Sequence, residues 1–97
     1  MGTPICVDIP PGLEEIVPDY LEGQKKLAIT LPQLLTASDL EAIRRIAHNL
    51  KNGAAFGFPI LTEIAGGMER SLRGAKLGEL TEQIRSLADY LARVTLR

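Results

Sequence analysis

Large aliphatic residues recur at spacings of three and four along most of the chain, and this period restricts the fold more than any other feature. Such spacing places apolar side chains on one stripe of an α-helix. The pattern is strongest from about Lys76 to the end of the chain, where it comprises Leu77, Leu80, Ile84, Leu87 and Leu91. Because the chain has two Tyr, two Phe and no Trp, its core must be mainly aliphatic. We therefore predict an all-α fold.

Three further segments carry the same kind of stripe, one before and two after residue 38. Their apolar positions are Leu27, Leu31, Leu34 and Leu35, then Leu40, Ile43, Ile46, Ala47 and Leu50, then Leu61, Ile64, Ala65, Met68 and Leu72. Short connections between consecutive helices favour antiparallel neighbours. We expect an antiparallel up-down four-helix bundle, with residues 1–97 forming a single domain.

The beginning of the chain lacks a clear period. We expect residues 1–10 to be irregular and Pro11 to open a short first helix that acts as a lid on the bundle. Pro18 should divide or kink this first helix, and Pro32 should bend or restart the following segment, 24–37, because each proline removes a backbone donor.

Two local sequences predict details of the helices. Residues 38–41 read Ser-Asp-Leu-Glu, a capping box in which Ser38 and Glu41 bond each other's backbone at a helix start. Gly66 and Gly67 lie inside a predicted helix, where each glycine costs about 1 kcal/mol relative to alanine. We expect them to permit close contact between two helices.

Composition excludes several classes of function. The formal net charge of −1 argues against binding to nucleic acid or to an anionic membrane. A lone Cys6 favours a reducing, cytoplasmic setting, and no apolar run reaches the length of a membrane helix. His48 is the only histidine, so neither a metal site nor a hydrolytic triad is expected. A phosphate-binding glycine loop is also missing, and we therefore do not expect an autonomous enzyme.

His48 is the candidate site. At about 100° per residue it lies roughly 140° from the centre of its helix's apolar face, so it should point to solvent. Arg44, Arg45, Lys51 and Asn52 are the polar residues three or four positions away. Their cations would stabilise a phosphoryl group attached to the imidazole. An exposed histidine on a charged face is nevertheless more often simply solvated, and spacing alone does not decide between the two interpretations.

Several segments together resemble histidine-containing phosphotransfer domains of multistep two-component relays. The signature around the histidine reads Ala-His-Asn-Leu-Lys at 47–51 and Gly-Ala-Ala-Phe-Gly-Phe-Pro at 53–59. Residues 7–10, 13–21 and 37–46 are similar to the family's first segment and to its approach to the histidine. The likeness covers nearly the whole chain.

This resemblance implies a phosphocarrier that takes a phosphoryl group from a receiver aspartate onto His48 and passes it to another receiver. Lys51 would be the basic neighbour of that group, assisted by Arg44 and Arg45. No cofactor is implied for this chain, because the partner receiver would supply Mg²⁺ and the catalytic groups. The implied partners are response-regulator receiver domains and a hybrid histidine kinase, in the cytoplasm.

Small residues near the histidine would let a receiver approach. The residues expected to flank the site are Ala47, Asn52, Gly53, Ala54, Ala55 and Gly57. Of the two phenylalanines nearby, we favour a core position for Phe58 and leave Phe56 open between core and docking surface.

The chain departs from the family after Lys51. Family members commonly have a glycine directly after the lysine and another ten residues after the histidine, whereas here Asn52 follows Lys51 and Gly57 lies nine residues after His48. We expect the helix to persist through Lys51 and to break or tighten between Asn52 and Gly57. Two alternatives stay open: a non-phosphorylated adaptor that binds receivers, and a domain excised from a hybrid or chemotaxis-type histidine kinase.

Overall fold

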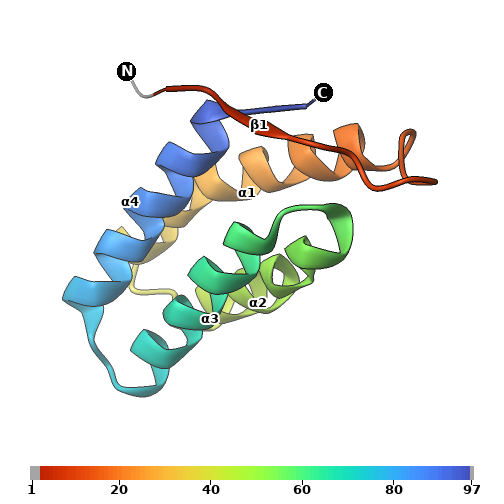
Figure 1. Cartoon of the computed structure of the whole chain (residues 1–97). Coiled ribbons are helices and arrows are strands. Elements are labelled where there is room, and N and C mark those ends of the chain that lie inside the picture. Colours follow the sequence, from red (N-terminus) through yellow and green to blue (C-terminus); the bar gives the residue numbers. More distant parts are fainter. Residues whose placement is uncertain (1–2, 97) are drawn as a thin grey trace.

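The computed structural model describes residues 3–96, which are mostly helical (Figure 1). Four α-helices are joined by short connections, a 3-10 helix follows the second, and a short strand lies at each end of the described chain. The elements are β1 (Ile5–Val7), α1 (Val17–Thr36), α2 (Leu40–Leu50), η1 (Lys51–Phe56), α3 (Pro59–Arg73), α4 (Leu77–Arg93) and β2 (Val94–Leu96). The predicted helical fold is confirmed, with a two-stranded sheet added to it.

The four helices surround one hydrophobic core. Each helix packs against the next along the chain, and α1 also packs against α4. The largest fully buried side chains include Phe58, Leu31, Ile43, Leu61 and Leu87. These residues come from the predicted stripes and from the start of α3. The antiparallel up-down direction of the helices stays a prediction.

The prediction of a separate lid helix is wrong. α1 is one continuous helix of 20 residues, whereas a short first helix and a second helical segment were expected there. Pro18 lies in the first turn, where a backbone N–H needs no helical partner, so it does not divide the helix. Pro32 lies inside α1 without ending it. Residues 11–16 form turns, and the carbonyl of Leu13 accepts hydrogen bonds from the N–H groups of Ile16 and Val17.

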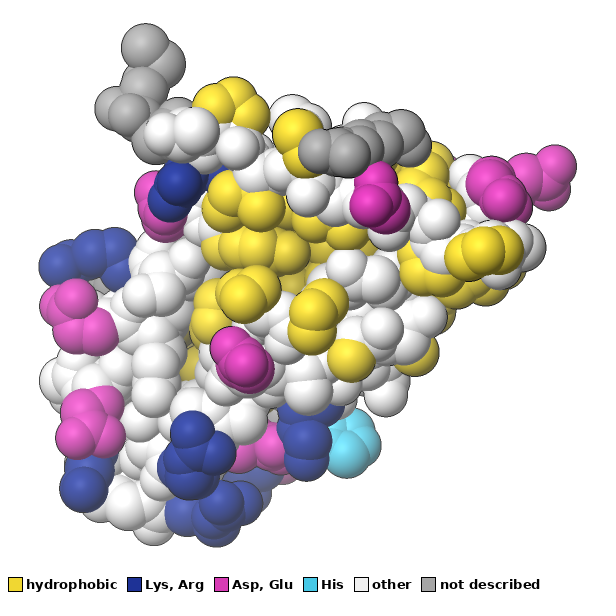
Figure 2. All heavy atoms as spheres, in the orientation of Figure 1, with side chains coloured by type: hydrophobic (Ala, Val, Ile, Leu, Met, Phe, Trp, Pro, Cys, Tyr) yellow, Lys and Arg dark blue, Asp and Glu magenta, His cyan; other side chains and the backbone are white. Residues whose placement is uncertain are grey.

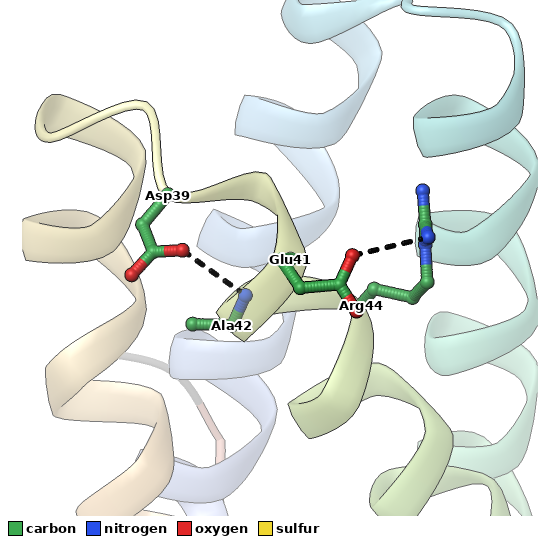
Figure 3. Close-up of polar contacts among 4 residues, drawn as sticks. All are labelled: Asp39, Glu41, Ala42 and Arg44. Carbon is green, nitrogen blue, oxygen red and sulfur yellow. Dashed lines mark hydrogen bonds and ion pairs between the residues drawn. The ribbon is translucent and has the colours of Figure 1, made fainter.

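The junction between α1 and α2 uses Ser38 and Asp39 differently from the predicted capping box. Ser38 adopts a left-handed conformation with φ 56°, and the N–H groups of Ser38 and Asp39 bond the carbonyls of Leu35 and Leu34. This pairing is a Schellman motif that ends α1. Asp39 is then the N-cap of α2, where its carboxylate accepts a hydrogen bond from Ala42 N–H at 3.3 Å (Figure 3).

The two ends of the described chain form a small parallel sheet. β1 and β2 lie side by side, with Ile5 opposite Val94 and Val7 opposite Leu96 (Figure 1). Arg93 adds a hydrogen bond from Nε to the carbonyl of Thr3 at 2.8 Å. Two predictions are therefore wrong. Residues 1–10 are not all irregular, because β1 lies among them, and the last helix ends at Arg93, where the apolar pattern had predicted that it would run to the end of the chain. Of the first ten residues, 1 and 2 lie outside the described part.

The paired glycines of α3 have different surroundings. A Cβ on Gly67 would lie 2.8 Å from Nε2 of Gln83 in α4, so close helix contact is confirmed there. Gln83 also accepts a hydrogen bond from the buried Ser71 hydroxyl at 2.9 Å. A Cβ on Gly66 would meet only the end of the Arg70 side chain, at 3.5 Å. Of the pair, Gly67 is therefore the glycine that lies against α4, where a larger residue would displace the Gln83 side chain.

Candidate phosphoacceptor site

The helix that carries His48 tightens where the sequence is one residue short. α2 is regular to Leu50, and residues 51–56 continue as the 3-10 helix η1. Lys51 keeps a helical backbone, with φ −62° and ψ −18°, and its N–H bonds the carbonyl of Ala47. The predicted tightening is confirmed, although the regular α-helix ends one residue earlier than expected. A 3-10 helix rises about 2.0 Å per residue against 1.5 Å in an α-helix, so fewer residues span the same length.

His48 projects into solvent from the outer face of α2. Its side chain is 76% exposed, whereas Ile43 and Leu50 on the opposite face are fully buried. In Figure 2 the imidazole stands at the lower edge of the molecule, beside lysine and arginine side chains. The predicted orientation is therefore confirmed.

Glu69 of α3 contacts both His48 and Lys51. Its Oε1 lies 3.0 Å from Nζ of Lys51, and its Oε2 lies 4.0 Å from Nδ1 of His48. The Glu69 side chain is only 17% exposed, whereas the side chains of Lys51 and His48 are 45% and 76% exposed. Glu69 was not among the site residues predicted from the sequence. The available signal was its place three residues before Leu72 and four after Ala65, at the edge of the apolar stripe of α3.

The two arginines border the site without contacting the imidazole in a hydrogen bond. Nη1 of Arg44 bonds Oε2 of Glu41 at 3.2 Å (Figure 3). A hollow of about 370 Å³ beside the histidine is lined by Arg44, Arg45, His48, Asn49 and Glu69. Both predicted arginines thus face the same hollow as His48, and Asn49 is a lining residue that the sequence analysis did not name.

The predicted flanking residues divide into two groups. Asn52, Ala54 and Ala55 are exposed on η1, as a contact with a partner requires. Ala47 is fully buried in the core and Gly53 is buried, so neither presents open surface to a receiver. The open approach expected at Ala47 is not seen, because its helix face packs inward, and Gly53, which was predicted only to flank the site, lies against α3.

Glycine is required at two positions of the turn after His48. A Cβ on Gly53 would lie 2.6 Å from Cβ of Leu61 and 2.9 Å from the carbonyl oxygen of Phe58. Gly57 has φ 94°, and a Cβ there would lie 3.2 Å from the carbonyl oxygen of Asp8. The first position needs close approach and the second needs a left-handed backbone. Both therefore shape the turn rather than leave room for a partner.

Aromatic side chains join this turn to α1. The rings of Tyr20 and Phe56 stack with centroids 4.1 Å apart and planes 11° apart, and Phe58 lies fully buried beneath them, 6.0 Å from Tyr20. The core position predicted for Phe58 is confirmed, and Phe56 is half-buried. Burial raises the pKa of the Tyr20 phenol, because the charged phenolate is poorly solvated there.

Within residues 3–96, no group of three or more His, Cys, Asp or Glu side chains is placed to hold a metal ion. None of the helices in that range is both long and apolar enough to cross a membrane.

Comparison with protein families decides the relationship of the chain. The family model of the Hpt domain matches residues 15–95, a range that includes all four helices completely. The chain belongs to the Hpt domain family. No curated protein and no solved structure matches it. As an Hpt domain it has a phosphotransfer role in two-component signalling, as a carrier rather than a catalyst, and works with receiver domains and histidine kinases.

Proposed function

We propose that this Hpt domain carries a phosphoryl group on His48, accepting it from a receiver aspartate and passing it to a second receiver. The observation that carries the proposal is the solvent-exposed imidazole beside the Lys51–Glu69 ion pair. The receiver would supply Mg²⁺ and the groups that act on its own aspartate. A cytoplasmic location, favoured by the lone cysteine, belongs to the same proposal.

In the transfer step, a ring nitrogen of His48 attacks phosphorus and the bond from phosphorus to the aspartate oxygen breaks. The electron pair of that bond returns to the aspartate as a carboxylate. Charge on the equatorial phosphoryl oxygens is then offset by Lys51 and by Arg44 and Arg45, which line the hollow beside His48. Since phosphoryl transfer is catalysed mainly by positioning and electrostatic stabilisation, an exposed nucleophile with cations beside it is sufficient on this side of the complex.

The direct test is incubation of the domain with phosphorylated receiver domains. Phosphohistidine is labile in acid and stable in base, which distinguishes it from the acyl phosphate of the receiver and from phosphoserine. We expect such a phosphate on the wild-type domain. A domain that binds receivers but acquires no phosphate would instead be the adaptor, an alternative that the shortened segment after Lys51 favours.

We expect the phosphoryl group on Nε2 of His48. Nδ1 is the ring nitrogen that faces Glu69, at 4.0 Å from Oε2, so a phosphoryl dianion on Nδ1 would lie against a carboxylate. At such short range, like charges repel by at least about 1 kcal/mol even in water. Nitrogen-15 and phosphorus-31 NMR of the labelled domain, kept at alkaline pH, distinguishes the two isomers. Phosphate found on Nδ1 would contradict the expectation that the Glu69 carboxylate keeps the phosphoryl group off that nitrogen.

Lys51→Ala should lower the rate of phosphoryl transfer by about tenfold, the effect of losing about 1.4 kcal/mol of transition-state stabilisation. Lys51 is paired with Glu69 in the resting domain, and we expect its ammonium to turn to the phosphoryl oxygens when they arrive. Stability should change by no more than about 1 kcal/mol, because the Lys51 side chain is 45% exposed. Transfer is measured by quenched-flow labelling and stability by urea unfolding.

Lys25→Ala is the matched control. Lys25 also forms an ion pair with a glutamate, Glu22, at 3.9 Å, but it lies in the groove between α1 and α4. His48 is on α2 and faces Glu69 of α3, so Lys25 belongs to a different pair of helices. Equal rates for the two lysine variants would remove Lys51 from the transfer step.

A further inference from the structure

Thr62, one turn into α3, holds the turn that follows His48. Its hydroxyl donates a hydrogen bond to the carbonyl of Lys51 at 2.9 Å and accepts one from the N–H of Ala54, also at 2.9 Å. A 3-10 turn pairs the carbonyl of one residue with the N–H three residues later, and Lys51 and Ala54 have that spacing. One side chain therefore bonds both backbone groups of the first turn of η1.

Residues of α3 consequently bind Lys51 both at its backbone and at the end of its side chain. Thr62 bonds its backbone carbonyl, and Glu69 pairs with its ammonium at 3.0 Å. Thr62 and Glu69 are seven residues apart, which places them on the same face of α3, about two turns or roughly 10 Å apart. The buried Gly53 adds a third contact, because its backbone lies directly against Leu61. Together these contacts fix the position of the Lys51 backbone, from which its side chain extends.

We propose that Thr62 is a positioning residue for phosphoryl transfer. Its hydroxyl fixes the backbone of Lys51, so that the Lys51 ammonium can leave Glu69 and bind the phosphoryl oxygens while the turn stays in place. This inference rests on the proposed function of His48 and Lys51. According to this inference, Thr62 also determines the shape of the shortened segment, because its hydroxyl bonds Lys51 and Ala54, between which the chain is one residue short of the family. Thr62 does not contact the phosphoryl group and acts only through Lys51.

The test compares Thr62→Val, which keeps the shape but removes the hydroxyl, with Thr62→Ser, which keeps the hydroxyl. Phosphoramidate is the phosphoryl donor, because it needs no cognate receiver, and the second-order rate constant of His48 labelling is the readout. We expect Thr62→Val to lower that constant by about fivefold to tenfold, since small misplacements of a catalytic group are costly. Thr62→Ser should restore at least half of the wild-type value. Thr30→Val is the control, because the Thr30 hydroxyl donates its hydrogen bond to the carbonyl of Lys26 within its own helix, α1.

A double-mutant cycle with Lys51→Ala separates positioning from general stability. If Thr62 acts through Lys51, Thr62→Val should change the rate less than twofold when Lys51 is already alanine. Rates are compared at a temperature where circular dichroism shows every variant to be folded. The exchange of the Ala54 amide with deuterium should be faster in Thr62→Val and slow again in Thr62→Ser, which shows that the hydroxyl holds the turn.

Each result has a distinct meaning. Additive losses in the cycle, or equal rates for the valine and serine variants, would overturn the positioning role while leaving His48 as the acceptor. A wild-type domain that is labelled by phosphoramidate but by no receiver would overturn the proposed relay function alone. A wild-type domain that phosphoramidate does not label would overturn both.

Discussion

His48→Gln is expected to abolish phosphoryl acceptance completely and to leave the helical bundle folded. His48 is the only histidine in the chain, so no other imidazole is present to take its place. Its side chain is 76% exposed and lies 4.0 Å from the nearest charged partner, Glu69. Substitutions at such surface positions usually change stability by less than about 0.5 kcal/mol.

The measurement is the mass of the intact protein after incubation with a phosphorylated receiver, kept at alkaline pH so that phosphohistidine survives. The wild type should gain one phosphate and His48→Gln none. Asn49→Ala is the matched control, since Asn49 is exposed next to His48 and borders the same hollow. Persistent labelling of the glutamine variant at another residue would refute the carrier proposal, and unfolding of the variant would show that His48 has a structural role.

The sequence predicted α2, α3 and α4 as whole helices because each has an apolar stripe of its own, whereas it predicted only the later part of α1 as part of a separate helix. The buried residues of α2, such as Ile43 and Leu50, are those of the predicted stripe, and the same holds for Leu80 and Leu87 of α4. A stripe of this kind reflects local geometry, since side chains three and four apart share one face of a helix. The core could therefore be predicted without knowing how the helices are arranged.

Features that depend on contacts between distant segments could not be predicted in the same way. β1 and β2 are three residues each, and their pairing joins chain segments about ninety residues apart. Neither strand has a period long enough to be detected by itself. Proline was also misread in α1, because its effect depends on its place in the helix, and Pro18 lies in the first turn.

The same distinction applies to the site. His48 and Lys51 are on one turn of one segment, so their proximity follows from helix geometry alone. Glu69 and Thr62 come from α3, and their contacts depend on how α3 packs against α2 and η1. The buried position of Gly53 depends on that packing as well. The proximity of His48 and Lys51 could thus be predicted from the sequence, while the residues that contact them could be found only from the structure.

Gly53→Ala should lower the free energy of unfolding by about 2 kcal/mol, within the usual range for overpacking a core. The added methyl group would lie 2.6 Å from Cβ of Leu61 and 2.9 Å from the carbonyl oxygen of Phe58. Neither atom is the end of a flexible side chain, so the clash is relieved only if η1 moves away from α3. For a domain of this size, such a loss corresponds to a fall in Tm of roughly 10 °C, measured by circular dichroism during thermal and urea unfolding.

Gly66→Ala is the matched control, and it should stabilise the domain. A methyl group at Gly66 meets only Nη1 of Arg70, at 3.5 Å, and alanine is favoured over glycine inside a helix by up to about 1 kcal/mol. The two variants make the same chemical change, and the expected difference in sign comes from packing alone. Loss of transfer in Gly53→Ala with undiminished stability would mean that Gly53 leaves room for a receiver. Loss of both, with normal transfer in Gly66→Ala, would mean that contact between η1 and α3 places Lys51 for the reaction.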